Sequence, residues 1–285
     1  AADTLGAAAR DALLEEAQLT PKPGLIDLAN NGAHTDMDMD SFRRSAAALT
    51  PYFKQAVHIG LTYPGSGPAM DKLRPAGIAA EAAMLEATGG ANTHKGLIYA
   101  LGLLLCAMGQ TLSGGGENYF NHERQLANTG LPAELHRAKA APSSHGERIY
   151  ASRGVLGARG EAAAGFPHAV QALEALRRHR GAATETQARL LALLTSMAQL
   201  TDTNLLHRGG EAGLHLVQRG ARRILDLPLN QLEDALQKKP SFSLLLNAKQ
   251  ETSRLLKEDT EERQARQMVI RRQRSDPQKP KHFQR

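Results

Sequence analysis

The sequence predicts an all-α protein, a single multi-helix domain with a polar cleft between its helices. Alanine and leucine dominate, runs of β-branched residues are rare, and aromatic residues make up only 4% with no tryptophan, a composition that favours helices over strands. Apolar residues also recur at helical spacing between short segments rich in glycine and proline. With 285 residues and 41% hydrophobic residues, the chain is long enough to bury a core.

The first helix is predicted over residues 5–19, where Leu5, Ala9, Leu13 and Ala17 lie on one face. The segment TPKPG (20–24) ends it, because proline lacks the backbone donor and restricts the preceding residue. A polar loop follows, and we expect Asp40 or Ser41 to cap a second helix that runs to about Ile59. YPGSGP (63–68) is expected to be a loop, and TGGANTH (88–94) to separate helices over 76–87 and 95–110.

Beyond SGGG (113–116) the pattern indicates shorter helical pieces and then a loop over 154–165. Further helices are expected over 167–180, 184–200 and 211–225. Residues 1–230 are therefore predicted to form one all-helical domain. Residues 231–285 are an atypical charged C-terminal segment, with a possible helix to about Val269 and a last fifteen residues that we expect to be disordered.

Charge and cysteine content exclude several classes of protein. The formal net charge is +6, but residues 251–285 hold ten Lys and Arg against six Asp and Glu, so most of the excess lies in the tail. No basic groove interleaved with aromatic residues is visible, so we expect no nucleic-acid partner and a small anionic ligand. The single cysteine, Cys106, is expected to be a buried structural thiol.

The N-terminal segment is not expected to be a signal peptide, because it is acidic early and has no apolar core. The longest apolar stretch, Leu97–Met108, is too short to span a bilayer. We therefore expect a soluble, cytoplasmic protein with no membrane partner.

The loop GAHTDMD carries three alternating acidic residues, Asp36, Asp38 and Asp40. They resemble the opening of a calcium loop, but Ser41 and Ala47 stand where that loop needs glycine and glutamate. What remains is a cluster of carboxylates beside His34 that suits a magnesium-bound nucleotide. The alternative is that Asp40 caps the next helix and its neighbours are solvated.

ANTHKG places Asn92, Thr93, His94 and Lys95 at the start of a strongly apolar helix. Backbone N–H groups at a helix N-terminus, with a lysine beside them, favour phosphate binding. The spacing of a Walker A loop is missing. Ordinary helix capping by Asn92 or Thr93 is the alternative.

Two further segments combine basic residues with glycines. GARGEAAAG (157–165) contains Arg159, which can bind phosphate through two parallel hydrogen bonds, and Glu161, a candidate for proton transfer. A surface ion pair explains that segment equally well. The candidates in TDTNLLHRGGEAG are oxygen ligands and an Arg-Gly-Gly run before a helix: Asp202, Thr203, Asn204, Arg208, Gly209 and Gly210. Zinc-type Cys-His spacing, a GxSxG elbow and a Rossmann fingerprint are all missing from the sequence.

Taken together, PKPGLIDLANNGAHTDMD, LRPAG, ATGGANTHKGLIYALGLL, GARGEAAAGFP and DTNLLHRGGEAGL resemble the triphosphoribosyl-dephospho-CoA synthase family, from about Leu19 to Leu216. The resemblance implies that ATP and 3′-dephospho-CoA give 2′-(5″-triphosphoribosyl)-3′-dephospho-CoA with release of adenine. This product is the prosthetic-group precursor of the acyl carrier protein of malonate decarboxylase or citrate lyase, and the sequence is closer to the malonate decarboxylase branch. A separate holo-transferase would then load the precursor onto the carrier protein.

Within that resemblance, roles follow from chemical type. Asp36, Asp38 and Asp202 are candidates for binding Mg²⁺ or for stabilising a carbocation, and Asp36 is also a catalytic candidate. Phosphates would be bound by Lys22, Lys95, Arg159 and Arg208. His34, His94 and Glu161 are the proton-transfer candidates. Asn92, Thr93, Asn204, Gly209 and Gly210 are expected to contact substrate.

The sequence also departs from the family. Leu28 stands where a basic residue is usual, and nothing after Leu229 matches the motif S-P-G-G-S-A-D-L-L with which such enzymes commonly end. Two alternatives stay open. Asp-rich loops between helices would serve an all-α ribosyl hydrolase that acts on a nucleotide equally well, and the unmatched C-terminus suggests a catalytically impaired nucleotide-binding homologue.

Overall fold

The fold is entirely helical within the part of the chain that the structure describes. The computed structural model describes all residues except 23, 33, 115–118 and 239–285. Its helices are α1 (Ala2–Gln18), α2 (Met39–Thr62), α3 (Ser66–Ala87), α4 (Lys95–Gly114), α5 (Tyr119–Asn128), α6 (Leu131–Ala140), α7 (His145–Arg153), α8 (Ala158–Ala163), α9 (Pro167–His179), α10 (Glu185–Met197), α11 (Thr203–Leu225) and α12 (Leu229–Lys238). The predicted all-α class is confirmed.

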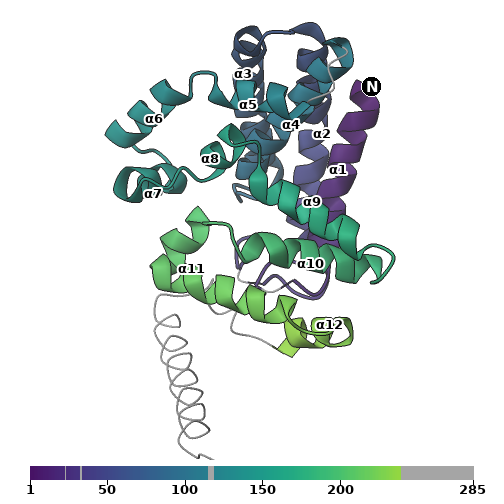
Figure 1. The fold of residues 1–285 in the computed structure, drawn as a ribbon. Helices are drawn as coiled ribbons and strands as arrows, with labels where there is room; N and C mark the ends of the chain where they lie inside the picture. The colour runs from purple at the N-terminus through teal and green to yellow at the C-terminus, as the bar shows by residue number, and fades with distance from the viewer. Residues whose placement is uncertain (23, 33, 115–118, 239–285) are drawn as a thin grey trace, which may run out of the picture.

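The larger core lies among α1 to α5, with α2 and α4 at its centre (Figure 1). These two helices touch backbone to backbone at glycines. A Cβ on Gly60 would lie 1.9 Å from the Cys106 carbonyl oxygen, and one on Gly109 would lie 2.3 Å from that of Val57. Cys106 itself is fully buried, as predicted, and burial raises the pKa of its thiol to about 12.

Among the described helices, α4 is long and apolar enough to cross a membrane by length and composition. The apolar stretch noted in the sequence, Leu97–Met108, is shorter than α4, which extends beyond it at both ends. In the fold α4 packs against α2, with Leu103, Leu105 and Ala107 buried. A core helix of this kind meets the same criteria as a membrane span.

A second, smaller core joins α10, α11 and α12 (Figure 1). Leu190, Leu194, Ile224 and Leu232 are buried in it, and Leu19 packs against it from the end of α1. The loop between α1 and α2 thus begins at the second core. In Figure 1 this loop, drawn in purple, runs beside α10 and α11 below the larger bundle.

Several helices differ from the predicted bounds. Helix α2 begins two residues earlier, because Asp38 caps it with Ser41 in a reciprocal capping box. Helix α3 begins at Ser66 instead of 76 and contains Pro75. A proline at this position removes one internal hydrogen bond, but the rest of the helix continues through it and packs against the first core.

Two changes concern the motif segments. The expected loop over 154–165 contains the short helix α8. Helix α11 begins at Thr203, and the backbone of Gly210 (φ 62°, ψ −164°) interrupts it just before the predicted start at 211. The possible helix towards Val269 and the expected disorder of the last fifteen residues lie outside the described residues.

Candidate nucleotide site

The loop between α1 and α2 is organised by the buried carboxylate of Asp27. Its Oδ2 accepts from the Lys22 backbone N–H at 2.9 Å, and its Oδ1 accepts from the N–H groups of Ala29 and Asn30 at 2.8 and 2.9 Å. These bonds fold the segment DLANN into a tight turn. Asp27 therefore shapes the loop.

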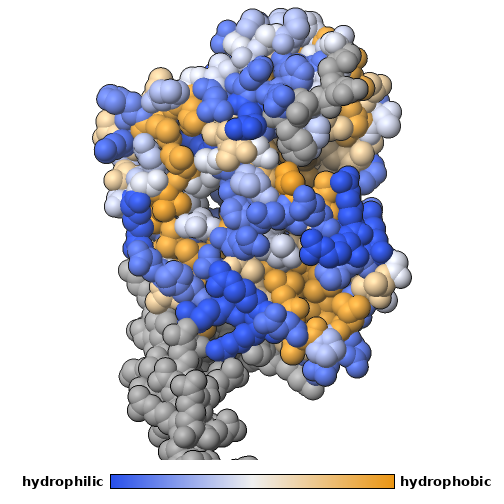
Figure 2. Space-filling model, in the orientation of Figure 1, coloured by the Kyte–Doolittle hydropathy of each residue, from blue (hydrophilic) through white to orange (hydrophobic). Residues whose placement is uncertain are grey.

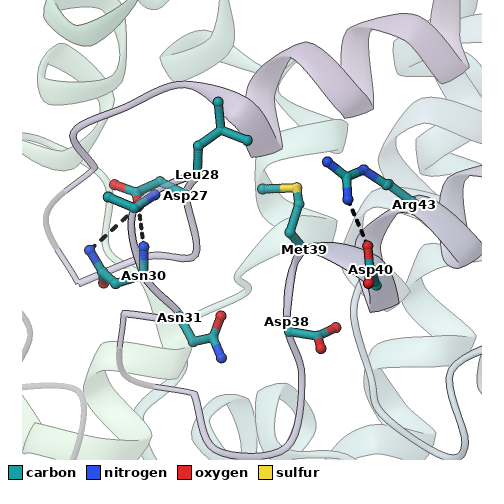
Figure 3. Close-up of a pocket in the computed structure, with 9 residues that line it drawn as sticks. Asp27, Leu28, Asn30, Asn31, Asp38, Met39, Asp40 and Arg43 are labelled. Atoms are coloured by element: carbon teal, nitrogen blue, oxygen red, sulfur yellow. Dashed lines mark hydrogen bonds and ion pairs between the residues drawn. The ribbon is translucent and has the colours of Figure 1, made fainter.

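This turn and the start of α2 line an open pocket of about 350 Å³. Figure 3 shows Asp27, Leu28 and Asn30 on one side of it and Met39, Asp40 and Arg43 on the other. Leu28, at the position where the family usually has a basic residue, is 61% exposed at this cavity. The complete lining is Asp27, Leu28, Ala29, Asn30, Asn31, Asp38, Met39, Asp40 and Arg43.

The predicted acidic candidates of this loop have different surroundings. Asp38 uses Oδ1 to accept from Ser41 N–H at 2.8 Å, and the backbone and side-chain hydrogen bonds of Ser41 hold the pKa of that carboxyl below its usual value. Asp36 is exposed, with Oδ1 3.5 Å from His34 Nδ1. Asp40, the cap expected from the sequence, instead pairs with Arg43 at 2.6 Å.

Lys22, a predicted phosphate ligand, is buried in this structure. Its ammonium donates to the Glu16 carbonyl oxygen at 2.7 Å and to Glu16 Oε1 at 2.8 Å. Only 2% of the side chain is exposed. A phosphate would therefore reach Lys22 only if this contact with α1 opened, and the role stays a prediction.

The same loop packs against ANTHKG. Ile26 and Met37 form a small buried cluster with Ala91, and Met39 and Phe42 from α2 pack on it. The ring of Phe42 meets the ring of His94 edge to face, with centroids 4.9 Å apart. The first two predicted motifs therefore lie together, and we call them the first half of the candidate site.

His94 is the most buried of the predicted proton-transfer groups, at 7% exposed. Its Nδ1 lies 2.7 Å from the Ser45 hydroxyl on α2, and its backbone N–H donates to Met84 Sδ at 3.2 Å. Burial lowers the pKa of the imidazole to about 4, so the ring is neutral near pH 7.

Asn92 and Lys95 lie exposed on either side of His94. Asn92 Oδ1 accepts from the Lys95 backbone N–H at 3.2 Å, which is the capping contact that the alternative interpretation expected. The Lys95 ammonium forms an ion pair with Glu81 of α3. Both side chains remain able to reach a ligand, because exposed ion pairs are weak and easily exchanged.

The other two motifs form a second half. A Cβ on Gly157 would lie 3.0 Å from Thr203 Cγ2, so GARGE and DTN meet directly. Val155 and Leu205 pack on a buried cluster of Ile149, Leu206 and Leu214. Leu205 also packs against the second core, as Leu19 does at the start of the α1–α2 loop.

Arg159 stands in a network of charges from four helices. It donates to Glu134 Oε2 at 3.3 Å and to Glu147 Oε1 at 3.1 Å. Glu134 Oε1 also accepts from Arg74 at 2.8 Å. Hydrogen bonds from Ser143, followed by the charge of Arg159, lower the pKa of Glu147 to about 2. The alternative that Arg159 makes an ion pair is confirmed, but it joins two carboxylates and only 28% of its side chain is exposed.

The remaining candidates have local partners. Glu161 Oε1 lies 2.7 Å from His168 Nδ1 at the start of α9. Asp202 caps α11, since its Oδ1 accepts from the N–H groups of Asn204 and Leu205 at 2.6 and 3.0 Å. Arg208 is exposed just before Gly209 and the break at Gly210, which confirms that a helical segment starts there.

Sequence reasoning missed Ser45, Glu134 and Glu147, because each lies in an unremarkable helical segment. Arg74 had one signal, since LRPAG was among the motifs of the resemblance. Tyr99 was missed as well. It lies one turn after Lys95, and burial followed by the charge of Glu134 raises its pKa to about 12. Tyr99 thus connects the start of α4 with the arginine network.

Magnesium was predicted from Asp36, Asp38 and Asp202. Within the described residues no three His, Cys, Asp or Glu side chains form a group that could hold a metal ion alone. Mg²⁺ bound to a nucleotide needs only one or two protein carboxylates, because phosphates and water supply the other ligands. The exposed Asp36 fits that requirement, and so does the second oxygen of Asp202, which has no hydrogen bond in the described part of the chain.

The surface agrees with a polar site between the two cores. Figure 2 shows hydrophilic residues across the middle of the molecule, between apolar surface over α6 and α7 and apolar surface below α10. Carboxylates, arginines and a buried imidazole near helix starts define a class: an all-helical enzyme with an inter-helix site for an anionic substrate.

The comparisons with known proteins identify the family. The model of the ATP:dephospho-CoA triphosphoribosyl transferase family (CitG) matches residues 2–250, and so extends beyond about Leu216, where the resemblance in the sequence ends. The chain belongs to this family of transferases.

Its relatives are probable 2-(5″-triphosphoribosyl)-3′-dephosphocoenzyme-A synthases. That of Vibrio cholerae is 44% identical over 78% of this chain and 74% of its own length. The Pectobacterium atrosepticum synthase is 42% identical over 77% and 75%, and the probable Pseudomonas syringae pv. tomato synthase 40% identical over 82% and 84%. No solved structure matches the chain.

Proposed function

We propose that this protein forms 2′-(5″-triphosphoribosyl)-3′-dephospho-CoA from ATP and 3′-dephospho-CoA and releases adenine. Membership of the transferase family supports the reaction class. The observation that carries the proposal to this chain is the pairing of its motifs. The α1–α2 loop packs on ANTHKG, GARGE packs on DTN, and both halves border the second core.

The reaction needs a base, a proton donor and carboxylates near the ribose. The ribose 2′-hydroxyl of dephospho-CoA attacks C1 of the ATP ribose, the bond from C1 to adenine breaks, and its electrons leave with the purine. The hydroxyl proton goes to a base, and adenine takes up a proton as it leaves. Each proton-transfer group in such a step typically contributes about 10²–10⁴ in rate. Carboxylates near the ribose stabilise the positive charge that develops on it.

The second half suits the triphosphate. Arg159 and Arg74 are fixed by a shared carboxylate, Glu134, and each guanidinium has more N–H donors than that contact uses. Arg208 and the backbone at Gly209 and Gly210 add a further helix start to this half. Bound Mg²⁺, with Asp36 or Asp202 among its ligands, would neutralise phosphate charge.

The first half suits the base and the ribose. It offers a neutral, desolvated imidazole at His94 with the polar side chains of Asn92 and Thr93 beside it. Asp36 with His34 and Glu161 with His168 are the carboxylate–histidine pairs available for proton transfer. We propose Asp36 and Glu161 as the candidates for the hydroxyl proton, since carboxylates paired in this way are ready acceptors.

Mass analysis of products tests the proposal. Purified protein with Mg²⁺-ATP and 3′-dephospho-CoA should yield dephospho-CoA with added triphosphoribose and an equal amount of free adenine. Ribose triphosphate formed at the same rate without dephospho-CoA would instead indicate the hydrolase. Thermal stabilisation by ATP with no adenine release would indicate an impaired homologue.

We further propose that the product serves malonate decarboxylase, through a holo-transferase that loads its acyl carrier protein. The supporting observation is the closeness of LTPKPGLIDLANNGAHTDMD and DTNLLHRGG to that branch. Incubating the product with a holo-transferase and either carrier protein would test it. Modification of the malonate decarboxylase carrier is the expected result, and modification of the citrate lyase carrier alone would contradict it.

A further inference from the structure

His94 occupies an unusual position among the motif residues, because it is nine-tenths buried and yet, among the described residues, only one of its two ring nitrogens has a hydrogen-bond partner. Its Nδ1 lies 2.7 Å from Ser45 Oγ. Its Nε2 makes no hydrogen bond to any residue that the structure describes. Nε2 is not among the fully buried polar atoms that lack a partner, so it reaches the surface, where a ligand can bind it.

The hydroxyls around Nδ1 determine which nitrogen carries the proton. Thr93 Oγ1 donates to Ser45 Oγ at 2.8 Å. A serine hydroxyl has one hydrogen of its own to donate. Helical hydroxyls often donate it to a carbonyl one turn back, as Thr50 does to Ala46 at 2.9 Å, but Ser45 makes no such bond in the described structure. The hydrogen of Ser45 therefore points to Nδ1, and Nδ1 is an acceptor.

We propose that Ser45 and Thr93 are positioning residues that hold His94 as the neutral imidazole protonated at Nε2, so that His94 offers the nucleotide a hydrogen-bond donor and not a base. The inference rests on the proposed function for the identity of the ligand, but the state of the ring does not depend on it. Burial, which keeps the imidazole uncharged near neutral pH, agrees with this.

The acceptor is a lone pair on ATP. Two parts of ATP offer one, the ring nitrogens of adenine and the phosphate oxygens. A donor held at a departing purine stabilises the negative charge that develops there. In either case His94 is excluded as the acceptor of the 2′-hydroxyl proton, and a carboxylate such as Asp36 or Glu161 is left for that role.

Long-range ¹H–¹⁵N spectra of the full-length chain labelled at its histidines test the state of the ring directly. A His94→Gln variant assigns the signal among the 11 histidines. We expect the pattern of an imidazole protonated at Nε2 at neutral pH, without any ligand. A proton on Nδ1, or on both nitrogens, overturns the proposal whatever the enzyme's activity.

Ser45→Ala and Thr50→Ala form a matched pair on the same helix. Removing the Ser45 hydroxyl should move His94 towards a mixture of both tautomers. Removing that of Thr50, which bonds only to its own helix, should leave the signal unchanged. An unchanged signal in Ser45→Ala would contradict the positioning role.

Two substitutions of His94 separate donor from base. A glutamine amide can place an N–H near the position of Nε2, whereas an asparagine amide reaches only the position of Nδ1. We expect adenine release by His94→Gln within about tenfold of the wild type and by His94→Asn about 10²-fold or more below it, in the range of a lost catalytic group. Equal losses in both would overturn the donor role.

The spectra also identify the acceptor. Adenosine supplies only the purine, and inorganic tripolyphosphate supplies only the phosphate oxygens. We expect ATP and one of these two to shift the His94 Nε2 signal. If ATP leaves it unchanged, the donor role is wrong even when the transferase reaction proceeds.

Discussion

The two halves of the site differ in how they treat charge. In the first half burial dominates: His94 is kept neutral, its ring contacts the Ser45 hydroxyl, and Thr93 donates to Ser45 in turn. In the second half charges are kept and paired, with Arg159 between Glu134 and Glu147. One half is suited to an uncharged base and ribose, the other to a triphosphate. A single nucleotide that spans both would use the two environments at once.

The largest effect is expected in the arginine network, where a substitution tests whether the second half binds phosphate. Arg159→Ala should lower kcat/KM for ATP by about 10²–10³, because a fixed charged donor to phosphate is lost. Arg137→Ala is the matched control. Arg137 also approaches Glu147, at 3.8 Å, but its side chain is 67% exposed. If steady-state kinetics show equal losses in the two variants, the network only supports the fold.

The pH dependence of stability tests whether burial also keeps the Glu123 carboxyl uncharged. It is fully buried on α5, and within the described residues neither carboxylate oxygen has a hydrogen-bond partner. Burial raises its pKa to about 8. The folded state therefore binds more protons than the unfolded state between pH 4.5 and 8, and stability should fall as the pH rises through that window, by on the order of 1 kcal/mol per pH unit.

Thermal unfolding of Glu123→Gln against pH measures this effect. The variant should lose most of the decline in Tm between pH 5 and 8. Glu174→Gln, on the exposed face of α9, should retain the decline. A wild-type Tm that stays level over this range would contradict the uncharged state of Glu123.

Two substitutions of Asp202 distinguish its role as the cap of α11 from a role in binding Mg²⁺. Asp202→Ala removes the cap of α11 and should cost about 1 kcal/mol of stability, whereas Asp202→Ser keeps a capping oxygen and should cost only a few tenths. If the second oxygen of Asp202 binds Mg²⁺, both variants should need more Mg²⁺ for adenine release. Asp202→Ser with an unchanged Mg²⁺ requirement would leave only the cap.

The sequence allowed much of the fold to be predicted, because its helices carry regular apolar spacing and clear breakers such as TPKPG and TGGANTH. It failed where a rule of local structure was overridden. Helix α3 continues through Pro75, and α8 forms inside a glycine-rich segment. Tertiary packing decides such cases, and a local pattern does not record it.

For the candidate site, the motifs indicated segments but not the residues that pair with them in the fold. The pairing of Arg159 with Glu134 and Glu147, and of His94 with Ser45, joins residues 12 to 49 positions apart. Serine in RRSAAAL has nothing in its neighbours to single it out. The burial of Lys22 against Glu16 was equally invisible, since it depends on how the loop returns to α1.

Hydrogen exchange with and without ATP tests the central claim, that the two halves form one nucleotide site. We expect ATP with Mg²⁺ to slow exchange of backbone amides both in residues 91–96 and in residues 157–161. Dephospho-CoA alone should not reproduce the full pattern. Protection confined to one of the two segments would contradict a site that spans both halves.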